Sequence, residues 1–568
     1  MVKAPANKSI CWAAVVVFLL TLAFWAPGVR YRLVNFDDND YVFDNPHVLG
    51  GLTPAAIWWA WTDTAQAANW HPLTWMSLQA DVSMSGVREQ PVGKTPRFET
   101  PAFDRISSVM HLHNALLHAA NATLLFLLMW MMLEGLSVSG HESLKGEEGG
   151  NTGRSPFTFH LSSFALFALL WAVHPLRAEA VAWVSERKEV LSAFFMLLTL
   201  VCHVRGHLIA ALAFYALALS AKPVAVSLPV VVFAIDWWRE GRPRWLRAAA
   251  YAVLAAACVG LTLLAQREVI EGSYLTFRER LPNVLAAFGS YAWQTLVPAR
   301  LSLMYPVLER FDWTFTFASF LALSVFWIGR RSPLVRLSAA WVVVGLLPMI
   351  GIVQVGCQSH ADRYTYWVGC GLTAVLGLMW VRHVPHGKYR AALLLLPLLL
   401  YGTLGWRQRE AWYDTESIFG MSYRNVPSPT SATAYAQAVK TRDRDAAERI
   451  YREARLRFPD DAFTISQLAV FLAVNRGPET FDEARALARE ALSLDDGNAF
   501  AFEALGFAAV RSGDFAEAEK AFLAAIERGS ESPSVQRGLA DARKGLAARP
   551  GPWRDGTPVK DEGKGTGP

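Results

Sequence analysis

The sequence predicts an all-α protein in which a polytopic membrane bundle of about 11 spans precedes a soluble α-solenoid. Hydrophobic residues make up 53% of the 568 residues, which is high for a soluble protein and ordinary for one with many spans. Apolar runs of spanning length recur across 1–406. From 407 to 549 the composition turns to Ala, Glu, Arg and Asp, and 550–568 is polar and expected to be disordered.

Each predicted span is an apolar run close to the roughly 20 residues that a helix needs to cross the hydrocarbon core. A further run, 284–297, is short and carries Gln294, so we expect it to lie in or dip into the membrane interface. The spans are centred near Val17, Leu125, Leu166, Leu197, Ala213, Val230, Ala255, Leu323, Val343, Leu376 and Leu396.

Basic residues in three short loops set the expected orientation. They lie in 239–247, 330–336 and 382–390, and the positive-inside rule assigns these loops to the cytoplasm. The first large loop, 29–106, and the C-terminal part then face outside. The net charge of +5 is small and dispersed, which argues against a nucleic-acid partner and leaves membrane lipids as the expected surroundings.

The first outer loop opens with two adjacent carboxylates, Asp37 and Asp38. Adjacent carboxylates repel, so the pKa of at least one is expected to rise unless a cation is near. A carboxylate at a membrane surface suits a general base that activates an acceptor hydroxyl. The alternative is an acidic turn before an interfacial helix, because Asp, Asn and Pro are common turn residues. The Trp-rich stretch 54–62 is such a helix, or an aromatic belt without further role.

The second outer turn, 174–189, is densely charged at the mouth of apolar helices. Such charges are costly in a membrane unless they are paired or functional. Arg187 and Lys188 could bind the phosphate of a lipid carrier, while Glu186 and Glu189 could simply pair with them. Arg363, in the last outer turn, is a second candidate for phosphate contact.

A repeat of small residues marks the soluble part. Ala484 and Ala491 precede Ala518 and Ala525 by 34 residues, which is the period of tetratricopeptide repeats. A preceding pair, Ala447 and Ala454, lies 37 residues earlier. Small residues allow paired helices to pack closely. The concave surface of such an array binds peptide or protein segments, or the array serves as a spacer or cap.

Several motifs, in this order along the chain, resemble one family. The motifs are Asn35-Phe36-Asp37-Asp38 with Asn45-Pro46, His71-Pro72-Leu73-Thr74, His113 to His118, His174-Pro175 with Glu179 to Ala182 and Glu186 to Glu189, Ala221-Lys222-Pro223 and Asp362-Arg363-Tyr364. They resemble the transmembrane and tetratricopeptide-repeat-containing proteins, which are related to the protein O-mannosyltransferases of the C-type glycosyltransferase fold. The resemblance covers nearly the whole chain.

The resemblance implies a glycosyltransferase that moves a sugar, mannose among the candidates, from a polyprenyl-phosphate donor to a hydroxyl acceptor on protein. It implies that Asp37 first, and Asp38 second, acts as the base on the non-cytoplasmic side. The implied residues for the donor phosphate are Arg187, Lys188 and Arg363. The implied substrate-binding residues are Asn45, His71, His174 and Glu186. The repeats would select the acceptor. The short loops favour a bacterial inner membrane, with the repeats on the periplasmic side.

Two departures from the family pattern leave the sugar and the acceptor open. The O-mannosyltransferases have Asp-Glu where this chain has Asp37-Asp38, and animal relatives often have Gly-Arg-Ala-Asp at 186–189. The sequence identifies no cofactor, and a divalent cation is compatible with the carboxylates although no ligand spacing demands one. The alternatives are an O-antigen ligase or polymerase, disfavoured because the large outer loop is the first, and a non-enzymatic membrane-anchored repeat scaffold, disfavoured by the charged helix mouths.

Overall fold

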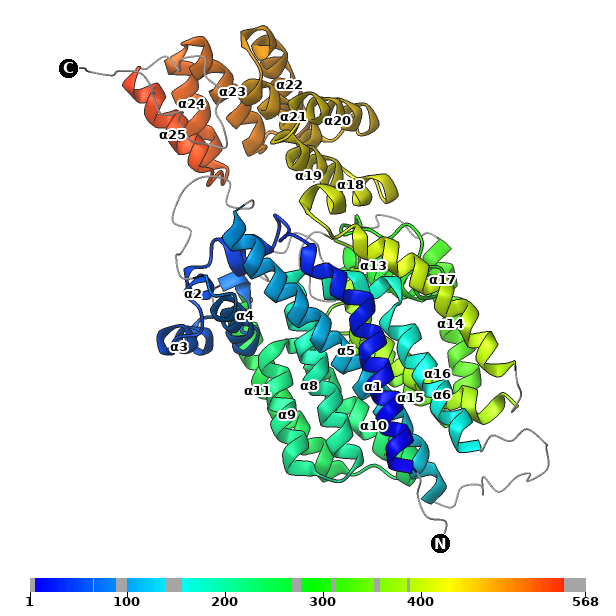
Figure 1. The fold of residues 1–568 in the computed structure, drawn as a ribbon. Helices are drawn as coiled ribbons and strands as arrows, with labels where there is room; N and C mark the ends of the chain where they lie inside the picture. The colour runs from blue at the N-terminus through cyan, green and yellow to red at the C-terminus, as the bar shows by residue number, and fades with distance from the viewer. Residues whose placement is uncertain are drawn as a thin grey trace. The chain divides into compact units, whose positions relative to one another are not determined.

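A computed structural model describes residues 6–64, 66–87, 100–138, 156–267, 277–307, 313–351, 358–385 and 389–545. Within these residues the secondary structure is helical, and the β-type pairing is an isolated bridge between Pro306 and Gln358. The all-α prediction is therefore confirmed for the described part of the chain. The chain forms two compact units, unit 1 ending at Asp414 and unit 2 beginning at Thr415 (Figure 1).

Unit 1 is a bundle of long helices with short helices and turns between them. Every predicted span centre lies in a helix of its own. The helices are α1 (Ala6–Trp25), α2 (Pro46–Leu49), α3 (Pro54–Thr62), α4 (Pro72–Met84), α5 (Pro101–Val138), α6 (Pro156–Ala172), α7 (Ala178–Ala182), α8 (Arg187–Val204), α9 (Leu208–Ala221), α10 (Leu228–Glu240), α11 (Trp245–Ala265), α13 (Phe277–Leu296), α14 (Trp313–Gly329), α15 (Pro333–Leu346), α16 (Thr365–His383) and α17 (Arg390–Glu410).

The long apolar helices identify a membrane protein. Four stretches of described residues are long and apolar enough to cross a membrane: Lys8–Arg30, Pro101–Glu134, Trp245–Ala265 and Asp362–His383. A fifth is a pair bent by 59°, His160–Ala172 with Pro175–Ala182. Several of the other predicted spans, such as α9 and α15 with 14 residues each, are shorter than a full crossing. The structure therefore confirms several apolar helices, whereas the count of about 11 spans is not established.

At one end of the bundle, which we call the acidic end, charged residues that lie close to the first turns of several helices contact one another. There Glu186 pairs with Lys222 and Arg363. α10 and α16 begin shortly after Lys222 and Arg363 and run for 13 and 19 residues. At 1.5 Å per residue these helices are about 20 and 28 Å long. The basic turn 239–247 and the described residues 382–385 of the second basic turn follow them and therefore lie at the opposite end of the bundle.

α13 contacts the turn that carries Ser359 and His360. Asn283 Nδ2 donates to the carbonyl of Ser359, 3.0 Å away, and near the end of the helix Gln294 Nε2 lies 3.2 Å from His360 Nε2. α13 also packs along α14, where Trp293 meets Trp313.

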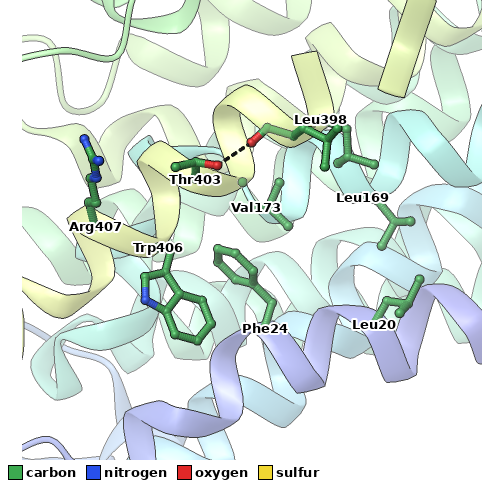
Figure 2. A pocket seen from close by; sticks show the side chains of 10 residues that line it. Leu20, Phe24, Leu169, Val173, Leu398, Thr403, Trp406 and Arg407 are labelled. Carbon is green, nitrogen blue, oxygen red and sulfur yellow. Dashed lines mark hydrogen bonds between the residues drawn. The ribbon is translucent and has the colours of Figure 1, made fainter. Parts of the chain in front are cut away.

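α17 packs against α1 and α6 at the edge of unit 1, where Phe24 and Trp406 face each other (Figure 2). Gly405 makes this approach feasible, because a Cβ there would collide with the Val173 carbonyl. The Trp25 indole donates to the carbonyl of Ala172 at 3.0 Å and fixes α1 against α6.

Unit 2 consists of short antiparallel helices that pack in sequence order. Asp443, Asp461, Asn498 and Asp514 cap four of them, each accepting a hydrogen bond from a backbone N–H of the first turn. The helices are α18 (Thr415–Asn425), α19 (Pro429–Lys440), α20 (Arg444–Arg457), α21 (Ala462–Asn475), α22 (Phe481–Leu494), α23 (Ala499–Ser512), α24 (Phe515–Glu527) and α25 (Pro533–Lys544).

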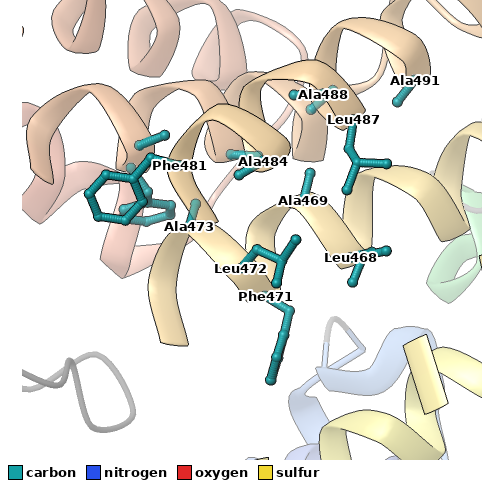
Figure 3. Close-up of a cluster of buried hydrophobic side chains, with 14 of the residues drawn as sticks. Leu468, Ala469, Phe471, Leu472, Ala473, Phe481, Ala484, Leu487, Ala488 and Ala491 are labelled. Atoms are coloured by element: carbon teal, nitrogen blue, oxygen red, sulfur yellow. The ribbon is translucent and has the colours of Figure 1, made fainter. Parts of the chain in front are cut away.

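Small side chains line the core of unit 2. In Figure 3, Ala469 and Ala473 of α21 lie beside Ala484 and Ala488 of α22. The periodic alanines of the sequence are all fully buried: Ala447, Ala454, Ala484, Ala491, Ala518 and Ala525. At Gly506 of α23 an added Cβ would lie 2.6 Å from the ring of Phe522, so this crossing requires glycine.

Candidate functional site

Asp38 ties the first loop to the bend before α8. Its Oδ2 accepts from the backbone N–H of Val34 at 2.7 Å, and its Oδ1 accepts from the backbone N–H of Ser185 at 2.9 Å and from the Ser185 hydroxyl. Burial raises the pKa of Asp38 to about 6, although these three hydrogen bonds lower it. Because both oxygens are engaged and the residue is 1% exposed, Asp38 positions the loop.

Asp37, the neighbouring residue, is only partly buried and faces cations. Burial raises the pKa of its carboxyl above the ordinary value, and Glu186 and Asp40 also raise it. Lys188 and Arg363 act in the opposite direction. A carboxylate with a raised pKa is a stronger base than an ordinary carboxylate, and the two cations beside it can hold an anionic group.

Seven acidic and basic side chains form what we call the charged cluster: Asp37, Glu179, Glu186, Lys188, Glu189, Lys222 and Arg363. Glu186 is its centre, since one oxygen lies 3.1 Å from Lys188 Nζ and 3.2 Å from Arg363 Nε, and the other lies 3.2 Å from Lys222 Nζ. Burial alone would raise the pKa of Glu186, but the three cations together lower it to about 2. Glu186 is therefore an ionised anchor that holds the cations together.

The cations of the charged cluster are matched by glutamates. The backbone N–H of Arg363 donates to Glu179 at 3.0 Å, its guanidinium pairs with the same carboxylate, and Lys222 pairs with Glu189. Three cations thus face three glutamates, and Asp37 adds one more acid. The pairing that the sequence left open is real, although Glu189 pairs with Lys222 rather than with Arg187.

Aromatic rings support two of these cations. Lys188 Nζ lies 4.3 Å from the centre of the Tyr41 ring and donates to the Tyr41 hydroxyl at 3.1 Å. The Arg363 guanidinium lies 5.5 Å from the Trp183 ring. Such contacts stabilise a cation without consuming all its donors. Both side chains also remain 11–12% exposed, so a ligand can still reach them.

Arg187 belongs to a different site, which we call the Arg187 network and which comprises Ser77, Asp81, His113, Asn114 and Arg187. Arg187 Nη2 lies 2.7 Å from Asp81 Oδ2, Nη1 donates to Ser77 Oγ at 2.8 Å, and Nε donates to Asn114 Oδ1. The Arg187 side chain has no exposed surface. Because its donors are taken up by protein groups, we withdraw the prediction that Arg187 binds the donor phosphate.

His71 and Asn45 lie in the same outer loop but differ in their contacts. The His71 ring stacks on Tyr41, with 5.5 Å between centroids and 18° between planes. Burial and the nearby Lys188 and Lys222 lower the pKa of His71 well below its ordinary value, so the ring is neutral. Its Nε2 has no hydrogen-bond partner among the described residues. Asn45 instead caps α2, accepting from two backbone N–H groups at 3.1 Å.

His174 lies at the bend after α6. Its Nε2 lies 3.1 Å from the carbonyl of Thr295, and its Nδ1 accepts from the backbone N–H of Leu176 at 3.3 Å. Both ring nitrogens therefore contact backbone groups, and the ring joins α13 to the bend. The structure does not bring His174 into the charged cluster.

Three residues of the charged cluster were not predicted as site residues: Glu179, Glu189 and Lys222. All three lie inside motifs of the family resemblance. A lysine between two long apolar runs, followed by proline, was the available signal for Lys222, because such a charge in a membrane protein needs a partner. Among the described residues, no group of three or more His, Cys, Asp or Glu side chains is arranged to hold a metal ion.

Comparisons with known proteins agree loosely with the motif resemblance. No protein-family model matches the chain. The chain is similar to the protein O-mannosyl-transferase TMTC4 of Mus musculus, with 28% identity over 196 residues. The match covers 33% of this chain and 22% of that protein, so the chain spans about a fifth of the length of the curated relative.

Proposed function

We propose that this chain is a membrane glycosyltransferase that moves a sugar from a polyprenyl-phosphate donor to a hydroxyl group of a protein acceptor. The observation that carries the proposal is Asp37, a partly exposed carboxylate of raised pKa that faces Lys188 and Arg363. A base beside two cations suits a reaction in which a hydroxyl loses a proton while a phosphate departs. The similarity to a protein O-mannosyl-transferase supports the same reaction class.

In the proposed reaction Asp37 takes the proton of the acceptor hydroxyl, and the hydroxyl oxygen attacks the anomeric carbon of the sugar. The bond from that carbon to the phosphate oxygen breaks, with inversion, and the electron pair remains on the phosphate. Lys188 and Arg363 stabilise the charge that develops there, as charge-assisted hydrogen bonds to phosphate oxygens do.

The charge balance of the cluster fits this sequence of events. A lipid-phosphate-sugar diester carries one negative charge, and its phosphate product carries up to two. Asp37 becomes neutral as the phosphate gains charge, so the net charge inside a largely desolvated site stays constant. A constant charge avoids the large cost of creating an unpaired charge at low dielectric constant.

The neutral His71 ring is the residue that we assign to a sugar hydroxyl, because its Nε2 is buried and without a partner among the described residues. Glu186 holds the phosphate-binding cations in place. Asn45 and His174 bond the backbone, and we assign them to positioning of the loop and of α13.

The proposed organisation has a membrane domain, 1–406, with the large first outer loop 29–106 and about 11 spans. Tetratricopeptide repeats follow in 407–549, and the predicted disordered tail, 550–568, lies outside the described residues. The separation of the charged cluster from the basic turns supports a non-cytoplasmic site, by the positive-inside rule. The backbone N–H of Arg32, in the first outer loop, donates to the carbonyl of Tyr413 at 2.8 Å. The chain thus leaves α17 on the side of the proposed site, which supports repeats on the periplasmic side of a bacterial inner membrane.

The test is the variant Asp37→Asn in the purified full-length protein, with polyprenyl-phosphate mannose as donor and a Ser/Thr-containing peptide as acceptor. We expect transfer to fall by about 10²–10⁴-fold, the usual contribution of a general base. The apparent melting temperature should not change. Asp40→Asn, which removes an exposed carboxylate three residues away, is the matched control and should remain active. Full activity of Asp37→Asn would refute the base assignment.

A further inference from the structure

An apolar groove of about 480 Å³ opens between α1, α6 and α17 (Figure 2), and no residue of the charged cluster lines it. Its volume lies within the roughly 300–1,000 Å³ of sites that bury small ligands. Leucines line much of it, and Arg407 supplies its one basic side chain. The surrounding faces of α1 and α17 expose large apolar side chains, which is the composition of a lipid-facing surface.

The groove is ordered along the bundle. Leu20 and Leu398 lie toward one end of it, and Phe24, Trp406 and Arg407 toward the other (Figure 2). From Leu398 to Arg407 the helix rises about 13 Å, at 1.5 Å per residue. One leaflet contributes about half of the roughly 30 Å hydrocarbon core. The groove therefore has the length that one lipid chain spans in one leaflet.

The polar end of the groove carries a positive charge. Arg409 is turned inward, where its guanidinium lies 3.8 Å from the centre of the Trp406 ring and pairs with Glu410. Arg407 is exposed, and among the described residues it has no carboxylate partner. It lies three residues before the end of α17, beside an indole of the kind that favours the headgroup layer. An arginine there is placed to bind a lipid phosphate.

The floor of the groove exists because Gly402 has no side chain. A Cβ added there would meet only Val173 Cγ2, at 3.8 Å, which is an ordinary contact. A larger side chain at this position would therefore fit the helix packing and project into the groove. This glycine offers a way to fill the groove without disturbing α17.

We propose that this groove binds one acyl chain of an anionic phospholipid, with the lipid phosphate on Arg407. The apolar lining excludes a peptide or sugar, and the single basic group at the headgroup level selects a negatively charged head. The inference needs only a membrane setting, so it does not depend on the proposed sugar transfer.

The test uses the purified full-length protein, stripped of lipid in detergent and then titrated with phosphatidylglycerol, phosphatidylcholine or polyprenyl phosphate, with bound lipid counted by native mass spectrometry. Wild type should retain one phosphatidylglycerol in preference to phosphatidylcholine. Gly402→Leu should lose this lipid, and Arg407→Gln should bind it about tenfold or more weakly and lose the preference. Leu400→Phe, on an exposed part of α17 outside the groove, and Arg105→Gln, an exposed arginine of α5, are controls that should bind as wild type does.

Unchanged binding in Arg407→Gln, or in a folded Gly402→Leu variant, would overturn the proposal. Displacement of phosphatidylglycerol by an equal concentration of polyprenyl phosphate would also overturn it, because the occupant would then be the sugar carrier. Arg407 lies on the surface of α17, so Arg407→Gln gives a decisive result even if Gly402→Leu fails to fold.

Discussion

Arg187 and Lys188 are neighbours in the sequence, yet they belong to two charged sites of opposite character. The Arg187 side chain is 0% exposed and its donors end on Asp81 and other protein groups. The Lys188 side chain is 12% exposed and lies over Tyr41, with one carboxylate partner, Glu186. One site is sealed, and the other can accept a ligand.

The difference follows from the two side chains and their surroundings. A guanidinium has five donors in a fixed plane, and a network that satisfies them fixes the helices around it. Arg187 thereby joins α8 to α4 and α5, through Ser77 and Asn114. An ammonium has three donors that rotate freely, so Lys188 can keep its protein partners and still bind an anion. A buried charge is therefore not by itself a sign of a catalytic group. A charged side chain that a ligand can still reach is the better candidate.

The largest expected effect of a substitution is on the sealed site. Arg187→Met removes the guanidinium from the buried carboxylate of Asp81, which keeps the His113 ring nitrogen 2.7 Å away. The loss of one partner of a buried pair costs about 3–5 kcal/mol. We expect a large fall in the apparent melting temperature and in the yield of folded protein. Arg187→Lys should rescue little, because an ammonium cannot reproduce the planar contacts.

The control is the double variant Arg187→Met, Asp81→Asn. The double variant should lose less stability than the sum of the losses in the two single variants, because substitutions of interacting neighbours are not additive. If Arg187→Met folded normally and lost only sugar transfer, the two sites would not differ as we argue, and Arg187 would return to the phosphate site.

Lys188→Met should give the converse result, a folded protein with weak transfer. Glu186 keeps Lys222 and Arg363 as partners, so the cluster stays paired. The developing phosphate charge loses one of two donors, which we expect to lower transfer by about 10²-fold. Lys188→Arg should retain part of the activity. The measurement is kcat/KM for the lipid-phosphate sugar beside the melting temperature, and equal kcat/KM in Lys188→Met and wild type would contradict the assignment.

Much of the fold could be predicted because apolar runs are visible in composition alone. Each predicted span centre lies in a helix, and the periodic alanines of unit 2, such as Ala484 and Ala518, are fully buried. Helix length could not be predicted, because short helices such as α9 and α15 are as apolar as a span. A full crossing depends on how neighbouring segments fold back, which is a tertiary property.

The co-location of some residues of the charged cluster could be predicted, while their roles in sugar transfer remain predictions. The sequence brought Asp37, Glu186, Lys188 and Arg363 into one hypothesis, and the structure places them together. It could not separate Arg187 from Lys188, since successive residues at a helix start point about 100° apart and only the surrounding helices decide what each meets. The pairing of Lys222 with Glu186 and Glu189 joins segments far apart in the chain, and no local pattern encodes it.

The pH dependence of transfer provides a finer comparison of the two sites. Asp37 must be ionised to act as a base, so activity should fall as the pH drops through its pKa. Lys188 lowers that pKa more than Arg363 does. The acid limb of kcat/KM should therefore move to higher pH in Lys188→Met and move less in Arg363→Gln. His113→Gln, in the Arg187 network, should leave the limb where it is.

A shift of the limb in His113→Gln equal to that in Lys188→Met would show that the two networks titrate together. An unmoved limb in Lys188→Met would show that Asp37 does not titrate in the reaction. Both results are read from pH profiles of purified variants at saturating acceptor.

The smallest expected effect concerns Asp38 and its partner Ser185. Burial raises the pKa of Asp38 from its ordinary 3.8 to about 6, so the folded state binds this proton more tightly than the unfolded state does. The contribution of Asp38 to stability is therefore largest at low pH and is lost as the pH rises from about 4 through 6. Ser185→Ala removes the hydroxyl that most lowers this pKa. The pKa of Asp38 in the folded state should then rise, so the loss of stability with increasing pH should extend to higher pH.

We expect Ser185→Ala to cost about 1–3 kcal/mol at neutral pH, since a buried acceptor loses one of its donors. Transfer should fall only severalfold, because Asp38 holds the loop rather than taking the proton. Ser185→Thr keeps the hydroxyl and should restore both properties. Melting temperatures between pH 4 and 8, measured beside transfer rates, separate the roles: a loss of transfer as deep as that of Asp37→Asn, in protein that remains folded, would make Asp38 the base and Asp37 its neighbour.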